Sequence, residues 1–195
     1  MTTRAPELVD RDRGRRGAPG ELSADDMGDA RLRTPTVTDG ADLWRALSAA
    51  GLDENSPYAY LLVATDFSQT SLVAEDDGGM LGAVAAYRPP IRPQAVFVWQ
   101  VGVLERGRGQ GLASRMLHHL VELPANRDAT ELTATVTPDN EASLRLFRGF
   151  ARDLGVACKE EPRFLREHFP AESGEHEPED ELVIGPLPPR PRAGP

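Results

Sequence analysis

The chain has 195 residues, a formal net charge of −9 and a sequence pI near 5.0. An acidic balance of this size argues against a nucleic-acid partner, because nucleic-acid-binding domains carry basic patches. A lone cysteine, Cys158, excludes an internal disulfide and a cysteine-rich zinc site, and we expect no metal. Since no apolar run approaches the ~18 residues of a membrane span and no signal-peptide pattern is present, we expect a cytoplasmic protein with no membrane partner.

Composition divides the chain into three parts. Residues 1–33 contain no aromatic residue and mix Arg, Asp, Gly and Pro, and residues 188–195 are mostly Pro, Arg and Gly. Neither end offers enough apolar surface to offset its ordering entropy, so we expect disordered tails at 1–33 and 188–195. Residues 34–187 are long enough for one domain with a buried core.

The expected elements follow from hydrophobic periodicity and from turn residues. In chain order they are a strand at 32–37, a helix between an N-cap at Asp39 and a stop at Gly51, a helix at 57–67, strands at 71–75, 80–87 and 95–103, a helix at 110–123, a strand at 132–136, helices at 139–147 and 161–169, and a strand at 181–184. Asp76-Asp77-Gly78-Gly79 predicts a hairpin turn. The order indicates an α/β layered domain whose mixed sheet contains one parallel, right-handed crossover through helix 110–123.

The most informative segment is residues 96–113, in which an apolar β-branched run leads through a glycine-rich turn into a helix. Glycines allow unusual backbone conformations, and several N–H groups of such a turn lack intrachain partners. Together with the helix dipole, this arrangement favours a bound phosphate. A dinucleotide fingerprint would follow the first strand, and a P-loop would carry a lysine that is missing here.

Arg-x-x-Gly-x-Gly-Leu-Ala at 106–113, after a Val-x-Val strand, resembles the acyl-CoA signature of the Gcn5-related N-acetyltransferases. Thr-Pro-Asp-Asn at 137–140 is similar to that family's second cofactor segment, although a plain helix cap is the alternative for Asn140. The resemblance implies a mixed, mostly antiparallel sheet flanked by helices, with acetyl-CoA as cosubstrate. The implied cofactor-binding residues are Val101, Val103, Arg106, Arg108, Gly109, Gln110, Gly111, Leu112, Ala113 and Asn140.

A narrower resemblance, over about residues 34–187, is to the L-2,4-diaminobutyrate acetyltransferases. It rests on Asn-Ser-x-Tyr-Ala-Tyr-Leu-Leu at 55–62, Phe-Val-Trp-Gln-Val at 97–101 and Gly-Glu-His-Glu-Pro-Glu at 174–179. It implies acetylation of the 4-amino group of L-2,4-diaminobutyrate in ectoine biosynthesis, a response to osmotic stress, by a homodimer. The residues it places around the acceptor are Asp53, Tyr58, Trp99, His176 and Glu179.

In this reading Asp53 or Glu179 pairs an ammonium group, Tyr58 forms a hydrogen bond, and Trp99 forms an aromatic wall. Backbone N–H groups near the end of strand 95–103 would polarise the thioester. Each side chain also has a plainer interpretation. Asp53 would belong to a solvated loop, Tyr58 and Trp99 would serve only for packing, and His176 and Glu179 would belong to a solvated acidic run. Either a carboxylate or His176 would remove the amine proton.

Two positions depart from the family pattern. Gly102 stands where we expect alanine, and Phe147 stands where many Gcn5-related enzymes carry a tyrosine that protonates the departing thiolate. A phenyl ring donates no proton, so water or a residue such as Tyr58 protonates the sulfur, or it leaves as thiolate, whose pKa of about 8.5 makes this tolerable. Acetylation of a polyamine or an aminoglycoside therefore stays open, as does a CoA-binding sensor without turnover.

Overall fold

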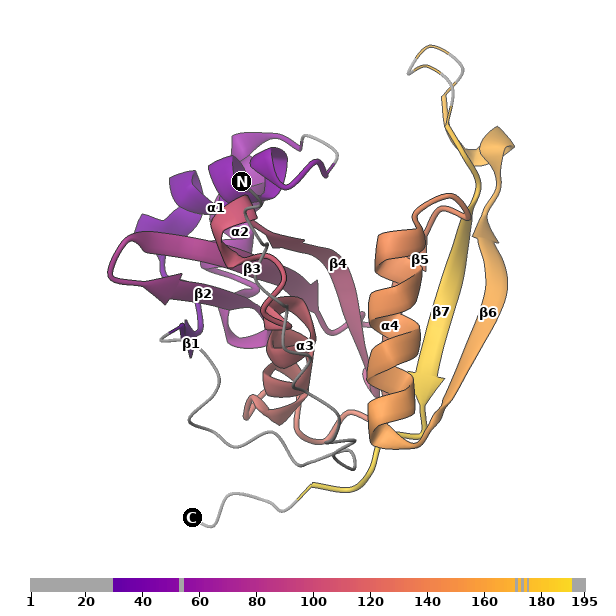
Figure 1. Cartoon of the computed structure of the whole chain (residues 1–195). Coiled ribbons are helices and arrows are strands. Elements are labelled where there is room, and N and C mark those ends of the chain that lie inside the picture. Colours follow the sequence, from indigo (N-terminus) through magenta and orange to yellow (C-terminus); the bar gives the residue numbers. More distant parts are fainter. Residues whose placement is uncertain (1–29, 53–54, 171, 173, 175, 191–195) are drawn as a thin grey trace, which may run out of the picture.

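The computed structural model describes residues 30–52, 55–170, 172, 174 and 176–190 (Figure 1). The strands are β1 (Arg31–Arg33), β2 (Leu72–Asp76), β3 (Gly79–Tyr87), β4 (Ala95–Val103), β5 (Glu131–Val136), β6 (Ala157–Phe164) and β7 (Glu179–Gly185). The helices are α1 (Gly40–Ala49), α2 (Pro57–Ala64), α3 (Leu112–Glu122) and α4 (Glu141–Leu154).

The strands of the described chain form one sheet in the order β1-β2-β3-β4-β5-β7-β6. Neighbours are antiparallel except β4 and β5, which are parallel and joined through α3. Successive side chains of each strand point to opposite faces of the sheet, and in the central strands β2, β3 and β4 most residues on both faces are buried. One face packs against α3 and α4, and the other packs against α1 and α2 (Figure 1). The expected mixed, mostly antiparallel sheet flanked by helices is confirmed.

The sheet forks in its middle. Parallel pairing of β4 with β5 extends only from Ala95↔Glu131 to Val98↔Ala134. Beyond Val98, β4 continues alongside β3, whereas β5 continues alongside β7. Figure 1 shows the two halves of the sheet diverging from this point. One edge of the second half of β4 is therefore left without a strand partner.

Many element boundaries match the sequence prediction, because local residues set them. β4 has the predicted bounds, and Asp76 and Gly79 enclose the predicted hairpin turn. Gly51 follows α1 with a φ of +85°, a conformation that favours glycine. Asp39 occupies the predicted N-cap position, but its carboxylate makes no capping hydrogen bond to the helix.

The helix predicted at 161–169 is wrong. Residues of this segment complete strand β6, which pairs with β7 from Ala157↔Gly185 to Phe164↔Glu179, and a short 3-10 helix follows at Arg166–His168. The segment is charged and contains Pro162, so its composition gives little strand signal. An edge strand tolerates both features because one side of its backbone faces away from the sheet.

Three other boundaries differ from expectation. α4 extends beyond residue 147 to Leu154, where Gly155 ends it with a φ of +66°. The strand expected at 32–37 is shorter, and Arg31–Arg33 pairs with β2, so the sheet includes residues assigned to the N-terminal tail. At the other end, Arg190 Nε donates to Glu122 at 2.9 Å, which ties part of the expected C-terminal tail to α3.

An ion pair joins β1 to the start of α1. The Arg33 guanidinium donates to both carboxylate oxygens of Asp39 at 2.8 Å and to Glu75 at 2.8 Å. The Asp39 side chain is 12% exposed. Hydrogen bonds from Arg33 lower the pKa of Asp39 from 3.8 to about 2. A carboxyl group with a lowered folded-state pKa stabilises the fold above its unfolded pKa, and this contribution is lost as the pH falls through the folded value.

We expect Asp39→Asn to lower the free energy of unfolding by about 2 kcal/mol at pH 7, which matches the pKa difference. The gap from the wild type should shrink between about pH 4 and pH 2. Urea unfolding at several pH values measures it. Asp42, whose pair with Arg45 is exposed, is the control, and Asp42→Asn should cost less than about 1 kcal/mol. Equal losses at pH 7 would contradict the assignment.

Candidate active site

The turn between β4 and α3 presents a row of backbone N–H groups. Gly109 and Gly111 have φ values of +77° and +67°, and Gly111 is the N-cap of α3. The amides of residues 109–114 donate to no group in the described part of the chain, whereas the Arg115 amide starts the helical pattern by donating to Gly111 at 3.0 Å. Six neighbouring donors at the positive end of a helix dipole form an anion-binding site.

The two arginines of this turn have different roles. Arg106 donates to both carboxylate oxygens of Asp76, at 2.8 and 2.7 Å, and to the carbonyl groups of Gly79 and Met80, at 2.7 and 2.8 Å. These bonds hold the pKa of Asp76 below its usual value. The Arg106 guanidinium thus fastens the turn to the β2–β3 hairpin, and the phosphate contact expected of it stays a prediction. Arg108 donates only Nε within the described chain, to Val103 O at 3.1 Å, and keeps its charge beside the turn.

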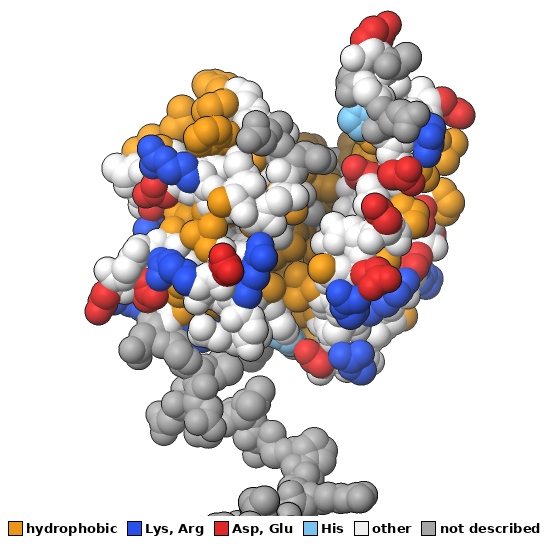
Figure 2. Space-filling model, turned by 45° about the horizontal axis from the view of Figure 1, so that its top comes forward, with side chains coloured by type: hydrophobic (Ala, Val, Ile, Leu, Met, Phe, Trp, Pro, Cys, Tyr) orange, Lys and Arg blue, Asp and Glu red, His pale blue; other side chains and the backbone are white. Residues whose placement is uncertain are grey.

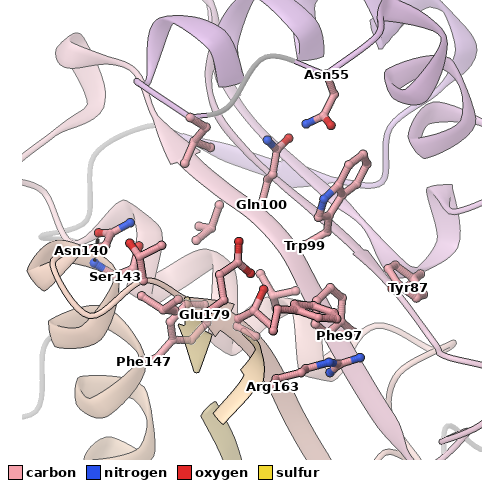
Figure 3. Close-up of a pocket in the computed structure, with 18 of the residues that line it drawn as sticks. Asn55, Tyr87, Phe97, Trp99, Gln100, Asn140, Ser143, Phe147, Arg163 and Glu179 are labelled. Atoms are coloured by element: carbon pink, nitrogen blue, oxygen red, sulfur yellow. Dashed lines mark hydrogen bonds between the residues drawn. The ribbon is translucent and has the colours of Figure 1, made fainter. Parts of the chain in front are cut away.

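A cleft of about 520 Å³ lies where β4 and β5 separate. Figure 2 shows the hollow between the two halves of the molecule, with apolar side chains on its floor. The described lining residues are Gly51, Leu52, Asn55, Tyr87, Phe97, Val98, Trp99, Gln100, Val101, Ala134, Thr135, Val136, Thr137, Asn140, Ser143, Phe147, Arg163, Phe164, Phe169 and Glu179 (Figure 3). Val101 lies on the unpaired edge of β4, which continues through Val103 toward the glycine turn.

The start of α4 forms one end of the cleft. Asn140 Oδ1 accepts a hydrogen bond from the Ser143 amide at 3.0 Å, so Asn140 is a helix cap. Asn140 and Ser143 both line the cleft as well, on the side of α4 (Figure 3). One turn further, Phe147 is 2% exposed and turns an apolar ring toward the same space. The position at which the family resemblance implies a tyrosine is therefore apolar.

A β-bulge shapes the middle of the cleft. Ala85 is opposite Gln100 and Ala86 is opposite Val98, so Trp99 is an extra residue in β4. A bulge re-aims side chains, and here Trp99 and Gln100, although adjacent, both lie toward the cleft (Figure 3). The hydroxyl of the fully buried Tyr60 donates to Gln100 Oε1 at 3.1 Å and fixes the orientation of its amide.

The structure brings together some of the expected acceptor residues. Trp99, 38% exposed, and Glu179 line the cleft, and the Glu179 carboxylate reaches toward its middle (Figure 3). His176 is not among the described lining residues but stacks on Phe169, which does line the cleft, with ring centroids 4.5 Å apart. Tyr58, in the first turn of α2, is 65% exposed and is not among the described lining residues. Asp53 lies outside the described residues.

Sequence reasoning missed Gln100, Arg163 and Phe169 as lining residues. Strand alternation places the neighbours of Trp99 on the opposite face, and only the bulge turns Gln100 to the same side. Arg163 and Phe169 belong to the segment that was expected to be a helix. For Gln100 the one available signal was its place beside Trp99 in the Trp-Gln-Val run, on which the family resemblance partly rests.

The close packing of α1 explains Gly102. A Cβ at this position would lie 2.9 Å from Ala50 Cβ and 3.0 Å from Leu47 Cδ2. Both contacts are shorter than normal carbon–carbon contacts of about 3.5 to 4 Å. The glycine therefore allows the end of α1 and Leu52, a lining residue, to approach β4.

We expect Gly102→Ala to lower the free energy of unfolding by about 1–3 kcal/mol through overpacking. Ala50 follows the last turn of α1, where glycine is tolerated, and Ala50→Gly removes one of the clashing methyl groups. The double variant should recover part of the loss, so a double-mutant cycle should give a favourable coupling of about 0.5 kcal/mol or more. Strictly additive effects would contradict the steric explanation.

Other classes of site are not evident in the described residues. They contain no group of three His, Cys, Asp or Glu side chains placed to hold a metal ion. None of their helices has the length and apolar character needed to cross a membrane. Burial raises the pKa of the Cys158 thiol.

Comparison with known proteins agrees with this geometry. Residues 41–150 match the acetyltransferase (GNAT) family. The chain is 42% identical over 171 residues to the L-2,4-diaminobutyric acid acetyltransferase of Nocardia farcinica, covering 87% of this chain and 86% of that protein. It is 43% identical over 162 residues to that of Streptomyces coelicolor, covering 82% and 94%.

Among solved structures, the chain is similar to the diaminobutyrate acetyltransferase of Paenibacillus lautus in complex with its substrate L-2,4-diaminobutyric acid and coenzyme A. The TM-score is 0.77 at 37% identity, over 81% of this chain and 95% of that chain. The fork in the sheet and the glycine turn are consistent with these similarities. The chain belongs to the GNAT family of acetyltransferases and, within it, to the L-2,4-diaminobutyric acid acetyltransferases.

Proposed function

We propose that this protein is an acetyl-CoA-dependent N-acetyltransferase that converts L-2,4-diaminobutyrate to N4-acetyl-L-2,4-diaminobutyrate in ectoine biosynthesis under osmotic stress. The observation that carries the proposal is a cleft at the β4–β5 fork that Trp99 and Glu179 line, together with the N–H-rich turn that follows the free edge of β4. The Paenibacillus lautus relative was solved with its substrate L-2,4-diaminobutyric acid and with coenzyme A, the cofactor left after acetyl transfer.

The residues present fit coenzyme A. The amides of residues 109–114 would hold the pyrophosphate, and Arg108 would add a positive charge. The unpaired β4 edge at Val101 and Val103 offers backbone groups to the pantetheine arm, in the way a strand adds to a sheet edge. When bound, acetyl-CoA supplies the acetyl group as an activated thioester.

The acceptor end provides charge for an amine. An alkyl amine has a pKa of about 10, arrives as an ammonium and must lose a proton before its lone pair attacks. Glu179 pairs the ammonium and accepts that proton, directly or through water, while the Trp99 ring provides a face that attracts the cation. N–H groups on the β4 edge stabilise the negative charge that develops on the carbonyl oxygen.

The other product is the thiol of coenzyme A. Phe147 donates no proton, so the sulfur leaves as thiolate or takes a proton from water. A thiol pKa of about 8.5 makes the thiolate an acceptable leaving group near neutral pH. The apolar Phe147 ring therefore does not prevent turnover.

Thiol release from acetyl-CoA with four amines tests the proposal. We expect turnover with diaminobutyrate and none or little with lysine, ornithine or spermidine, and NMR of the product should show the acetyl group on N4. Preference for spermidine would instead indicate a polyamine acetyltransferase. Tight binding of acetyl-CoA without thiol release for any amine would indicate a sensor.

We also propose a cytoplasmic homodimer, for which the exposed edge strand β6 offers one surface. Light scattering should then give twice the chain mass of 21.2 kDa. A monomer at micromolar concentration would contradict this assembly.

A further inference from the structure

The described lining of the cleft contains two opposite charges, which stand on the neighbouring strands β6 and β7. Among the described residues that line it, Arg163 is the one cation and Glu179 the one anion. Phe164 pairs with Glu179 across the β6–β7 ladder, so Arg163 is one residue away from the partner of Glu179. An acceptor that carries both an ammonium and a carboxylate offers a partner to each of these side chains, whereas a simple diamine offers no hydrogen-bond acceptor to Arg163.

Aromatic rings hold the Arg163 guanidinium in place. Its central carbon lies 5.2 Å from the Phe97 ring centroid (Figure 3) and 5.1 Å from that of Phe164, and both residues line the cleft. Stacking of this kind covers the faces of a guanidinium and leaves its edge of N–H donors for hydrogen bonds. Because the Arg163 side chain is already held in one orientation, it loses little conformational entropy when a ligand binds.

Ion pairs fix one corner of the same group. Arg163 Nη1 donates to Glu181, whose carboxylate also accepts from Arg92 at 2.9 and 3.0 Å, and Glu131 lies 3.2 Å from Arg92. This network balances two cations with two anions. Nε and Nη2 of Arg163 have no hydrogen-bond partner within the described chain, and the side chain is 29% exposed. The charges of the network cancel, and what Arg163 offers to a ligand is the pair of N–H donors at Nε and Nη2.

We propose that Arg163 binds the carboxylate of the amino-acid acceptor through Nε and Nη2. This inference rests on the proposed function, since it assigns a specificity determinant to the same cleft. Parallel N–H donors match the two oxygens of a carboxylate. With the carboxylate held at Arg163, the amino group farthest from it is the one presented to the thioester, which gives a physical basis for acetylation of the 4-amino rather than the 2-amino group.

A matched pair of acceptors tests the role of Arg163. L-2,4-Diaminobutyrate and 1,3-diaminopropane are the same diamine with and without the carboxylate. We expect the wild type to favour diaminobutyrate, and Arg163→Gln to lower its kcat/KM by about 10- to 100-fold, mainly through KM. The value for 1,3-diaminopropane and the KM for acetyl-CoA should change by less than about twofold. Arg163→Lys, which keeps the charge without the fork, should fall between.

Arg92→Gln is the control, because it breaks the same Glu181 network from a residue outside the described lining. It should leave the ratio of the two kcat/KM values unchanged. An equal change of the ratio in both variants, or an equal loss for both acceptors in Arg163→Gln, would overturn the proposal. Product NMR gives a second readout, in which the N2-acetyl share should rise in Arg163→Gln. No turnover of diaminobutyrate by the wild type would refute the proposed function itself, before Arg163 is tested.

Discussion

Replacing Glu179 by glutamine should lower kcat/KM for L-2,4-diaminobutyrate by about 10²- to 10⁴-fold, the range for loss of a positioned general base. Glutamine keeps the shape of the side chain but neither neutralises an ammonium nor accepts its proton. Glu179 is the one carboxylate in the described lining of the cleft and reaches its middle (Figure 3). Steady-state thiol release at varied amine concentration measures the loss, and the affinity for coenzyme A should change by less than about twofold.

Glu177 provides the control for this substitution. It lies two residues away in the same acidic run, pairs with Arg166 at 3.2 Å near the surface, and does not line the cleft. Glu177→Gln should retain the wild-type kcat/KM within about twofold. A comparable loss in both variants would mean that acidic charge near the β6–β7 hairpin acts at long range, and Glu179 would lose its assigned role.

Replacing Gly111 by valine should raise the Kd for coenzyme A by about 10- to 100-fold. A φ of +67° costs a residue with a side chain about 1–2 kcal/mol, and more for a β-branched residue. The turn would relieve this strain by moving, which would displace the unpartnered amides of residues 109–114. Calorimetry of coenzyme A binding to folded protein measures the change.

Gly155 provides a control that separates the effect of backbone strain on stability from its effect on the cofactor turn. Its φ of +66° is nearly that of Gly111, its surroundings are equally open, and it ends α4 away from the cofactor turn. Gly155→Val should lower the melting temperature about as much as Gly111→Val while leaving the Kd within about twofold. Equal weakening of binding in the two variants would show that general destabilisation, not the turn, governs affinity.

Acceptor chemistry was only partly predictable from the sequence. Trp99 and Glu179 were expected at the acceptor and do line the cleft, whereas Tyr58 and His176 are not among its described lining residues. Motif resemblance reports which residues recur together, but not which of them face the cavity. That property depends on how α2 and the β6–β7 hairpin pack around β4.

Arg106 and Arg163 also have contacts that the sequence did not predict and that only the packing of the fold decides. The family resemblance implied a phosphate contact for Arg106, and no role was predicted for Arg163. In the structure Arg106 forms hydrogen bonds to Asp76, thirty residues away in the sequence, and Arg163 stacks on the Phe97 ring. Long side chains choose partners across the fold, so their roles do not follow from sequence neighbours.

The sequence by itself determined the features that depend on the backbone chemistry of single residues: the hairpin turn at Asp76–Gly79, the left-handed glycines before α3, and the extent of β4. Only the tertiary structure decided the bulge at Trp99, the charged edge strand β6 and the fork between β4 and β5. The physical reason is that each of these arises from pairing with distant strands, and such pairing overrides local propensity wherever burial and backbone hydrogen bonds favour it.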